Sequence, residues 1–414
     1  MGLATSPLRH AGAVSLAASL LGASFAASAQ QAVSPFADRL TGDWNGSRLA
    51  LARRGISIDV DATLYYQGVE SGTGNDGYDF GSRFDLFPTL DTGKLGWWER
   101  GFIRAHVEYR TDDLDPTLGG TLMPTSLGVR LPADAHDWTL SSLHLVQRIG
   151  ERSTLIAGKI NTVDLLAGER VFGGYGVSRF GHLAFAAPIN GLTPPVIMGG
   201  ILKIETPSLG WTLMLYDAND RTRDSFDDLF GDGVNVSVGA THGFEIGGRA
   251  SSVNVSTIYS TKEGIDLGDV LLPPELETGV KSDSWHVSAQ FNHALWSDAA
   301  AGRSLAFSIK GGLSDGNPNP YERWVTTGLA GTGLFAARPR DGYGIGAFHY
   351  RFSTDLRNAL VPLARFGDEY GLEAFYDATL AAGLTVGANL QWIEPTFSGS
   401  DRALTLGLRA RLRF

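Results

Sequence analysis

Cysteine is absent from the 414 residues, which excludes disulfide bridges, thiol catalysis and metal sites built from thiolates. Basic residues are in the minority. The 34 Lys and Arg against 44 Asp and Glu give a formal net charge of −10, which argues against nucleic acid as a partner. After the N-terminal segment, no apolar run is long enough for a membrane helix. The best candidate, residues 182–201, is interrupted by Pro188, Pro194 and Pro195.

The N-terminal segment has the three parts of a secretory signal peptide. Arg9 supplies a positive charge, residues 11–25 form a run of small and apolar side chains, and Ala27-Ser28-Ala29 gives a cleavage site. A membrane anchor is the competing interpretation. It is disfavoured because the run is short, rich in Ala and Ser, and followed by no stop-transfer pattern. We therefore expect residues 1–29 to be removed and the mature chain to begin near Gln30.

The mature sequence is dominated by alternation of apolar and polar residues with a period of two, which is typical of β-strands with two different faces. Residues 56–67, 101–110, 285–295 and 384–392 show it. In the C-terminal segment, residues 404–414, leucines alternate with Arg409, Arg411 and Arg413. Three arginines cannot occupy a dry core without partners, so this face is expected to line water and the leucines to meet lipid or a protein core.

A soluble sandwich alternates as well, so further features must decide. The segments are about ten residues long, which suffices to cross a bilayer when tilted. Aromatic residues gather near segment ends, as interfacial girdles require, at Tyr65, Tyr66, Trp97, Trp98, Tyr109, Trp285, Trp296, Trp392 and Phe414. These features predict an all-β transmembrane antiparallel β-barrel in the Gram-negative outer membrane, over residues 56–414. Roughly 24 residues per strand and turn give about 16 strands, or 18, which encloses an aqueous channel.

A short helix is expected in residues 40–55, capped by Asp43 and ended by Gly55. We interpret residues 30–55 as a periplasmic segment in which this helix braces or plugs the end of the barrel.

Two long segments lack any periodicity, residues 112–137 and residues 161–200, and loops of this length are usually functional or disordered. One or both are expected to fold into the pore and narrow it; a solvated extracellular loop is an equally weighted alternative for any one residue. The second segment mixes charged and polar groups with aromatic rings, a composition suited to sugars. Its constriction candidates are Asp164, Glu169, Arg170, Arg179 and Asn190.

Charged residues on the polar faces of the strands are the candidates for lining the pore and bonding a solute. They are Asp59, Asp61, Arg83, Asp85, Arg104, His106, Glu108, Arg110, Arg409 and Arg411.

Several motifs suggest other chemistry but lack its context. Residues 312–316 match the nucleophile elbow, and Gly72, Gly74 and Gly77 match a dinucleotide fingerprint, yet no helix follows either one. Six aspartates in residues 217–232 have the oxygen ligands of a calcium site without the spacing of an EF-hand, so a hydrated loop is favoured. No catalytic residue, metal or cofactor is therefore predicted.

The opening of the mature chain resembles a known family. Residues 40–48, Leu-Thr-Gly-Asp-Trp-Asn-Gly-Ser-Arg, followed by Leu51 and Gly55-Ile56, are similar to the start of the OprB family of carbohydrate-selective porins, with Asn45 in place of a glycine. Gly158-Lys159 with Asp164, and residues 371–395 with Gln391, resemble later strands of that family, although a usual proline is missing. The resemblance implies a monomeric or trimeric porin of about sixteen strands that passes glucose-type sugars by passive diffusion.

The leading hypothesis is therefore a sugar-selective porin whose partners are small sugars, outer-membrane lipid and lipopolysaccharide, and the barrel-assembly machinery through the strand ending at Phe414. A general or ion-selective porin without a sugar site is the alternative. A barrel enzyme using Ser314 lacks a convincing base in the sequence, and an adhesive barrel lacks room for a large external domain.

Overall fold

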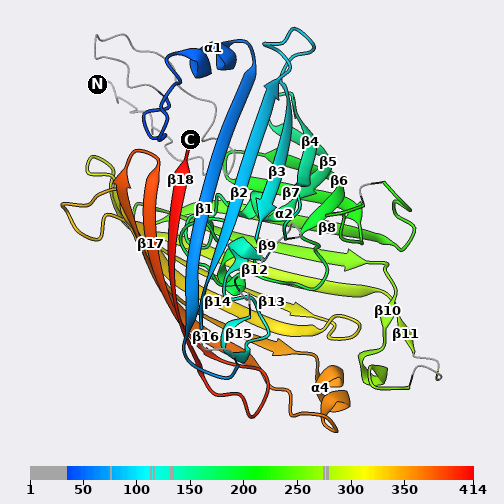
Figure 1. Cartoon of the computed structure of the whole chain (residues 1–414). Helices are drawn as coiled ribbons and strands as arrows, with labels where there is room; N and C mark the ends of the chain where they lie inside the picture. The colour runs from blue at the N-terminus through cyan, green and yellow to red at the C-terminus, as the bar shows by residue number, and fades with distance from the viewer. Residues whose placement is uncertain are drawn as a thin grey trace, which may run out of the picture.

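The computed structural model describes residues 35–414 except 75–76, 112–113, 115–116, 131–134, 225, 274–275 and 277–278. The expected signal peptide, residues 1–29, lies outside the described residues. Sixteen strands form one closed antiparallel barrel, which confirms the predicted fold class and the lower of the two expected strand numbers (Figure 1). No helix among the described residues is both long enough and apolar enough to cross a membrane.

The barrel strands occur in chain order around the wall, and β1 closes the circle by pairing with β18. They are β1 Ile56–Ser71, β2 Tyr78–Asp91, β3 Gly101–Arg110, β4 Thr139–Ile149, β5 Ser153–Asn161, β6 Val196–Glu205, β7 Leu209–Asp217, β8 Val234–Ile246, β9 Arg249–Ser260, β12 Ser284–Asp298, β13 Arg303–Ser314, β14 Tyr321–Thr332, β15 Gly342–Phe352, β16 Glu369–Ala381, β17 Leu384–Glu394 and β18 Ala403–Arg413. A separate small hairpin contains β10 Gly264–Ile265 and β11 Val280–Lys281.

The two faces of the strands point as the alternation predicts. On β1 and β18, Leu64 and Leu408 are about half exposed on the outside, while Thr63 and Thr405 are fully buried inside. Tyr65 was wrongly grouped with the interfacial aromatics. Its ring points inward, is 4 % exposed, and its hydroxyl donates to the carbonyl of Gly176.

The two ends of the barrel differ. The C-terminus, helix α1 (Ser47–Arg53) and the short turns lie at one end, whereas α4 (Thr354–Leu360) and the β10–β11 hairpin lie at the other (Figure 1). In outer-membrane barrels the short turns are periplasmic and the long loops extracellular. Exposed aromatics mark both ends: Trp97, Trp98, Trp211, Trp296 and Phe335 near the turns, and Trp138, Tyr259, Trp285 and Tyr370 near the loops.

Helix α1 is shorter than predicted. Its N-cap is Gly46 in a left-handed conformation, not Asp43, and no side chain caps it, although Gly55 follows its C-terminus as expected. The helix does brace the barrel. The buried guanidinium of Arg48 donates to the carbonyl oxygens of Phe414 (2.9 Å) and Ile58 (2.7 Å) and pairs with Asp59 at 2.8 Å. One side chain thus ties together the ends of β1 and β18.

Two long loops enter the barrel, as the sequence predicted. We call residues 111–138 loop L2 and residues 162–195 loop L3. Loop L2 contains the short 3-10 turns η2 (Leu118–Gly120) and η3 (Leu127–Val129), and L3 contains α2 (Thr162–Leu166) and α3 (Leu183–Ala186). L3 ends earlier than expected, because β6 already begins at Val196.

The loops build a hydrophobic core inside the barrel. Phe180 and Phe185 of L3 stack on each other with ring centroids 4.5 Å apart, and both rings meet the wall, at Phe375 and Phe348. Gly346 makes room for this contact, because a Cβ atom there would lie 2.6 Å from the Phe185 ring. Buried apolar side chains therefore fill one part of the lumen.

Candidate functional site

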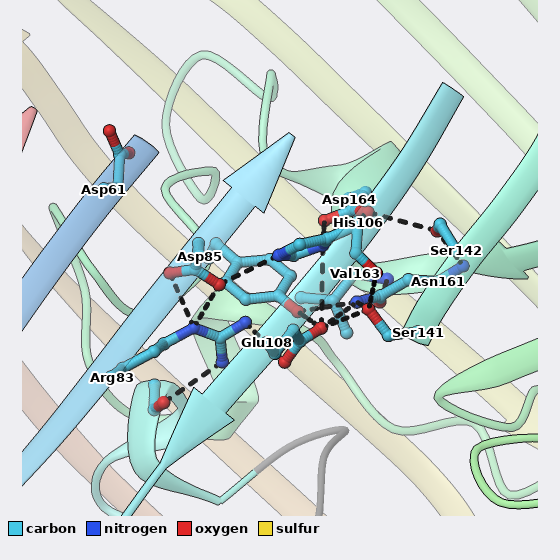
Figure 2. Close-up of polar contacts among 12 residues, drawn as sticks. Asp61, Arg83, Asp85, His106, Glu108, Ser141, Ser142, Asn161, Val163 and Asp164 are labelled. Carbon is cyan, nitrogen blue, oxygen red and sulfur yellow. Dashed lines mark hydrogen bonds and ion pairs between the residues drawn. The ribbon is translucent and has the colours of Figure 1, made fainter. Parts of the chain in front are cut away.

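On one side of the lumen, charged residues of β2 and β3 form a buried network with loop L3 (Figure 2). Arg83 donates through Nε to Asp85 at 2.8 Å and through Nη2 to Glu108 at 2.7 Å, and all three side chains are at most 3 % exposed. Glu108 in turn accepts from Asn161 (2.9 Å) and from the hydroxyl of Tyr175 (3.0 Å). The Arg83 guanidinium also lies over the Tyr175 ring, 4.1 Å from its centroid.

His106 connects this network to the start of L3. Its Nε2 lies 2.9 Å from Asp85 and its Nδ1 lies 3.0 Å from Asp164, the first acidic residue of α2 (Figure 2). Ser142 of β4 donates to the same Asp164 carboxylate at 3.4 Å. Every member of the network therefore has a partner, and the network fixes the position where L3 leaves the wall.

The opposite side of the lumen holds the loops through three carboxylates of β16, which recur at every fourth residue on its inner face. Each accepts hydrogen bonds from loop backbone amides at 2.6–3.0 Å. The donors are Leu122 and Met123 of L2 for Glu369, Gly181 and His182 of L3 for Glu373, and Arg179 of L3 for Asp377. The loops thus span the lumen between two charged walls.

The other predicted pore-lining residues differ in their roles. Arg409 pairs with Asp377 at 2.7 Å, and Arg411 pairs with Asp61. Asp61 stands apart from the Arg83 network in Figure 2. Arg110 donates to the carbonyl of Val129 in L2 at 2.6 Å. Arg104 is half-buried, and its guanidinium lies 5.9 Å from the centroid of the Phe102 ring; among the described residues it forms no hydrogen bond or ion pair.

The five predicted constriction residues do lie on L3, but they do not form one cluster. Glu169 reaches the far wall, where it pairs with Lys310 at 3.3 Å and accepts from Gln290 at 3.3 Å. Arg170 is exposed. Arg179 donates to backbone carbonyls of its own loop, and Asn190 bonds within the turn that precedes β6. Asp164 belongs to the buried network described above.

His182 is the most isolated titratable group of L3. Its ring is fully buried, stacks on Phe348 with centroids 4.3 Å apart, and caps α3 by accepting from the Ala184 amide at 3.1 Å. Burial lowers the pKa of His182 to about 3, so the imidazole is neutral under ordinary conditions.

A third part of the inner wall is neutral and reached by water. The strands β8, β9, β12 and β13 present uncharged inward-facing side chains that are partly or fully exposed: Thr241, Asn254, Ser256, Gln290 and Asn292. Lys310 is the charged residue of this group, and Glu169 of L3 pairs with it. These residues were not selected from the sequence, although Gln290 and Asn292 lie on the polar face of a segment recognised there. Charged residues were selected from the sequence as pore-lining candidates. This wall was missed because its hydrogen-bonding groups are amides and hydroxyls.

The structure shows the surroundings of one further acidic cluster and of two motifs that were judged non-functional from the sequence. Asp85, His106 and Glu108 lie close enough for a metal ion, but the Arg83 guanidinium already occupies this place and pairs with both carboxylates. Ser314 does meet a base, since His286 Nδ1 lies 2.9 Å from its hydroxyl. Both are buried, and among the described residues no carboxylate orients the imidazole. In the aspartate-rich loop, Asp217 accepts from Arg221 at 2.7 Å.

Comparison with known proteins identifies the family. The family model described as "Carbohydrate-selective porin, OprB family" matches residues 49–414. The chain belongs to the OprB family. Porin B of Pseudomonas aeruginosa is 23 % identical over 468 residues, covering 95 % of each chain. The high-pH structure of Pseudomonas putida OprB superposes with a TM-score of 0.79 at 19 % identity, over 93 % of this chain and all of that one. The low-pH structure of the same protein gives 0.58 at 17 % identity, over 91 % and 98 %.

Membership of the OprB family makes this protein a sugar-selective channel of the outer membrane, not an enzyme. In this OprB-family chain, the residues that sequence reasoning placed in the pore are mostly engaged in holding L2 and L3.

Proposed function

We propose that sugars cross this porin along the neutral wall formed by β8, β9, β12 and β13, on the side of the lumen that L3 leaves open to water. The observation that carries the proposal is the contrast between the two sides. Charges elsewhere in the lumen are mostly paired and buried, whereas this wall offers hydroxyl and amide groups that can both donate and accept. Such groups replace the hydrogen bonds that a sugar makes to water without attracting ions.

The narrowest part of this route is assigned to the place where L3 meets the wall. There Glu169 and Lys310 form an ion pair whose side chains are about 15 % exposed, with Gln290 beside them. Arg170, which is exposed on the same loop, would supply a further donor. Passage is by diffusion, so the sugar gradient alone sets its direction.

An apolar cavity at the extracellular mouth is proposed as the first point of contact. It measures about 320 Å³ and lies between L2, L3, α4 and the ends of β14 and β15. Tyr321, Phe352 and Phe366 contribute aromatic rings, and Arg130 a guanidinium. Aromatic faces stack on the apolar face of a pyranose, while a charged group bonds its hydroxyls.

The biogenesis of the chain is proposed from its sequence. Residues 1–29 act as a cleaved signal peptide, and the barrel-assembly machinery recognises the strand that ends at Phe414. The mature protein functions as a monomer or a homotrimer.

The test of the sugar route is glucose-dependent block of ion current through the purified porin in planar bilayers. Gln290→Leu removes the amide beside the L3 contact and is expected to weaken block about fivefold, the worth of one hydrogen bond of about 1 kcal/mol. Thr257→Leu, on the outer face of β9, is the matched control and should block as the wild type does. If Gln290→Leu leaves block unchanged while Arg104→Ala abolishes it, the route follows the β3 wall instead and the proposal is wrong.

A further inference from the structure

The outer wall carries a depression on the lipid-facing side of β9 and β12–β15. It measures about 500 Å³. Its floor is formed by Ala289 and Gly311, which face each other across β12 and β13, and Val255 and Val325 flank them in the same row. Leu313, 56 % exposed, stands on its extracellular side. Because Ala289 and Gly311 are smaller than the valines on either side of them, the lipid-facing surface of the barrel is hollowed here.

The extracellular edge of this depression is basic. Arg323 pairs in register with Leu313 on one side and Arg351 on the other, one outward-facing step above Val325. His349 lines the depression beside Val325. In the described part of the chain, the exposed Arg323 side chain forms no hydrogen bond or ion pair.

The charges around Arg323 leave an excess of positive charge. Arg351 pairs with Glu322 at 3.3 Å, and Asp368 is shared by His349 and Arg357, each at 3.1 Å. The guanidinium groups of Arg351 and Arg357 each have a carboxylate partner. Among the residues that the structure describes, the guanidinium of Arg323 has none.

The level of this edge in the membrane is set by aromatic residues. Tyr370 lies beside His349 on the next strand. Trp285 lies two residues, one outward-facing step, beyond Val287 toward the extracellular end of β12, and Val287 shares a register row with Leu313 and Arg323. Both rings are about 40 % exposed. Exposed Tyr and Trp residues mark the depth of lipid headgroups. The apolar depression is therefore at acyl-chain depth, and Arg323 is at headgroup depth in the outer leaflet.

We propose that this depression binds the lipid A part of one lipopolysaccharide molecule, with an acyl chain over Ala289 and Gly311 and a phosphate held by Arg323 and Arg351. Lipid A combines the two features that the site matches, several acyl chains and phosphates carried on an outer-leaflet glycolipid. Arginine suits this role because its planar fork of N–H donors matches phosphate oxygens. The proposal depends on the outer-membrane location and is independent of the sugar route.

The test is native mass spectrometry of the delipidated, folded porin titrated with purified diphosphoryl lipid A, monophosphoryl lipid A or phosphatidylglycerol. The wild type should bind diphosphoryl lipid A at least about tenfold more tightly than phosphatidylglycerol. Arg323→Glu should weaken lipid A binding about tenfold, whereas Arg323→Lys should retain most of it. Ala289→Phe, which fills the depression from a lipid-exposed position, should weaken binding of both lipid A species.

Matched controls separate the site from general effects. Arg249→Glu changes an exposed arginine near the opposite rim, and Ala388→Phe enlarges a small exposed residue on the outer face of β17; both should bind as the wild type does. Equal affinity for phosphatidylglycerol and lipid A would overturn the proposal, as would unchanged binding in both Arg323→Glu and Ala289→Phe. So would loss of an oligomer in Ala289→Phe, because the depression would then receive a second copy of the chain. Sugar block should be normal in every variant, which distinguishes this proposal from the sugar route.

Discussion

His182 shows how one buried residue makes the stability of the fold dependent on pH. The unfolded chain titrates near the ordinary histidine value of 6.5, whereas burial holds the folded-state pKa at about 3. Between these pH values the unfolded chain binds more protons than the folded chain. The free energy of unfolding therefore falls as the pH drops through 6.5 and stops falling below about 3.

His182→Asn is expected to reduce this pH dependence. Asparagine keeps an acceptor for the Ala184 amide but does not titrate. Between pH 7 and pH 4.5 the wild type should lose about 2–3 kcal/mol more than the variant, even though the variant is less stable at pH 7 because it lacks the stacking on Phe348. Urea unfolding in lipid vesicles at both pH values measures this difference. His242→Asn, at an exposed position, should behave as the wild type does; equal losses in wild type and His182→Asn would contradict the assignment.

The β16 strand and loop L3 are joined by hydrogen bonds from loop amides to strand carboxylates. Glu373 accepts from two successive amides, those of Gly181 and His182. Hydrogen bonds to a charged acceptor contribute about 1.5–3 kcal/mol each, and an amide cannot replace both acceptor oxygens. Glu373→Gln should therefore loosen L3, increase open-channel current noise and speed hydrogen exchange at these two amides by about tenfold.

The matched control is Glu394→Gln on the adjacent strand β17. The Glu394 carboxylate pairs with Arg402, whose side chain is 67 % exposed, so its contribution to stability is small. Hydrogen exchange that rises equally in both variants would show that L3 is held by its aromatic core and not by the carboxylate.

The hydrogen bonds between the β16 carboxylates and the loop amides could not be predicted from the sequence, whereas the faces of the strands could. Alternation identified the inner and outer faces of the strands correctly, because a period of two is a local property. The partners of Glu369 could not be predicted, since Leu122 lies 247 positions away and contributes only a backbone amide, which carries no signal of residue type. Gln290 was visible on a polar face, but neutral residues are common on such faces and charge drew the selection elsewhere.

At the scale of the whole molecule, the lumen has two parts, one filled by side chains and one open to water. The aromatic core of L2 and L3 fills one part of the lumen, and the exposed polar side chains of the neutral wall line the other part. Without cysteine, the loops depend on this packing and on the charged walls for a fixed position. Lipid contacts only the outside, so substitutions there should follow membrane depth and leave the pore unaffected.

Leu408→Arg tests that separation on the outer face. Leu408 is half exposed at the middle of β18, where an arginine meets hydrocarbon, and the substitution should reduce the free energy of unfolding by about 2–4 kcal/mol. Ile246→Arg, equally exposed but next to the periplasmic turn after β8, should cost about 0–1 kcal/mol. Urea unfolding in lipid vesicles measures both, and sugar block should match the wild type in each. An equal cost at the two positions would mean that Leu408 is covered by protein, as in an oligomer interface, and does not face lipid.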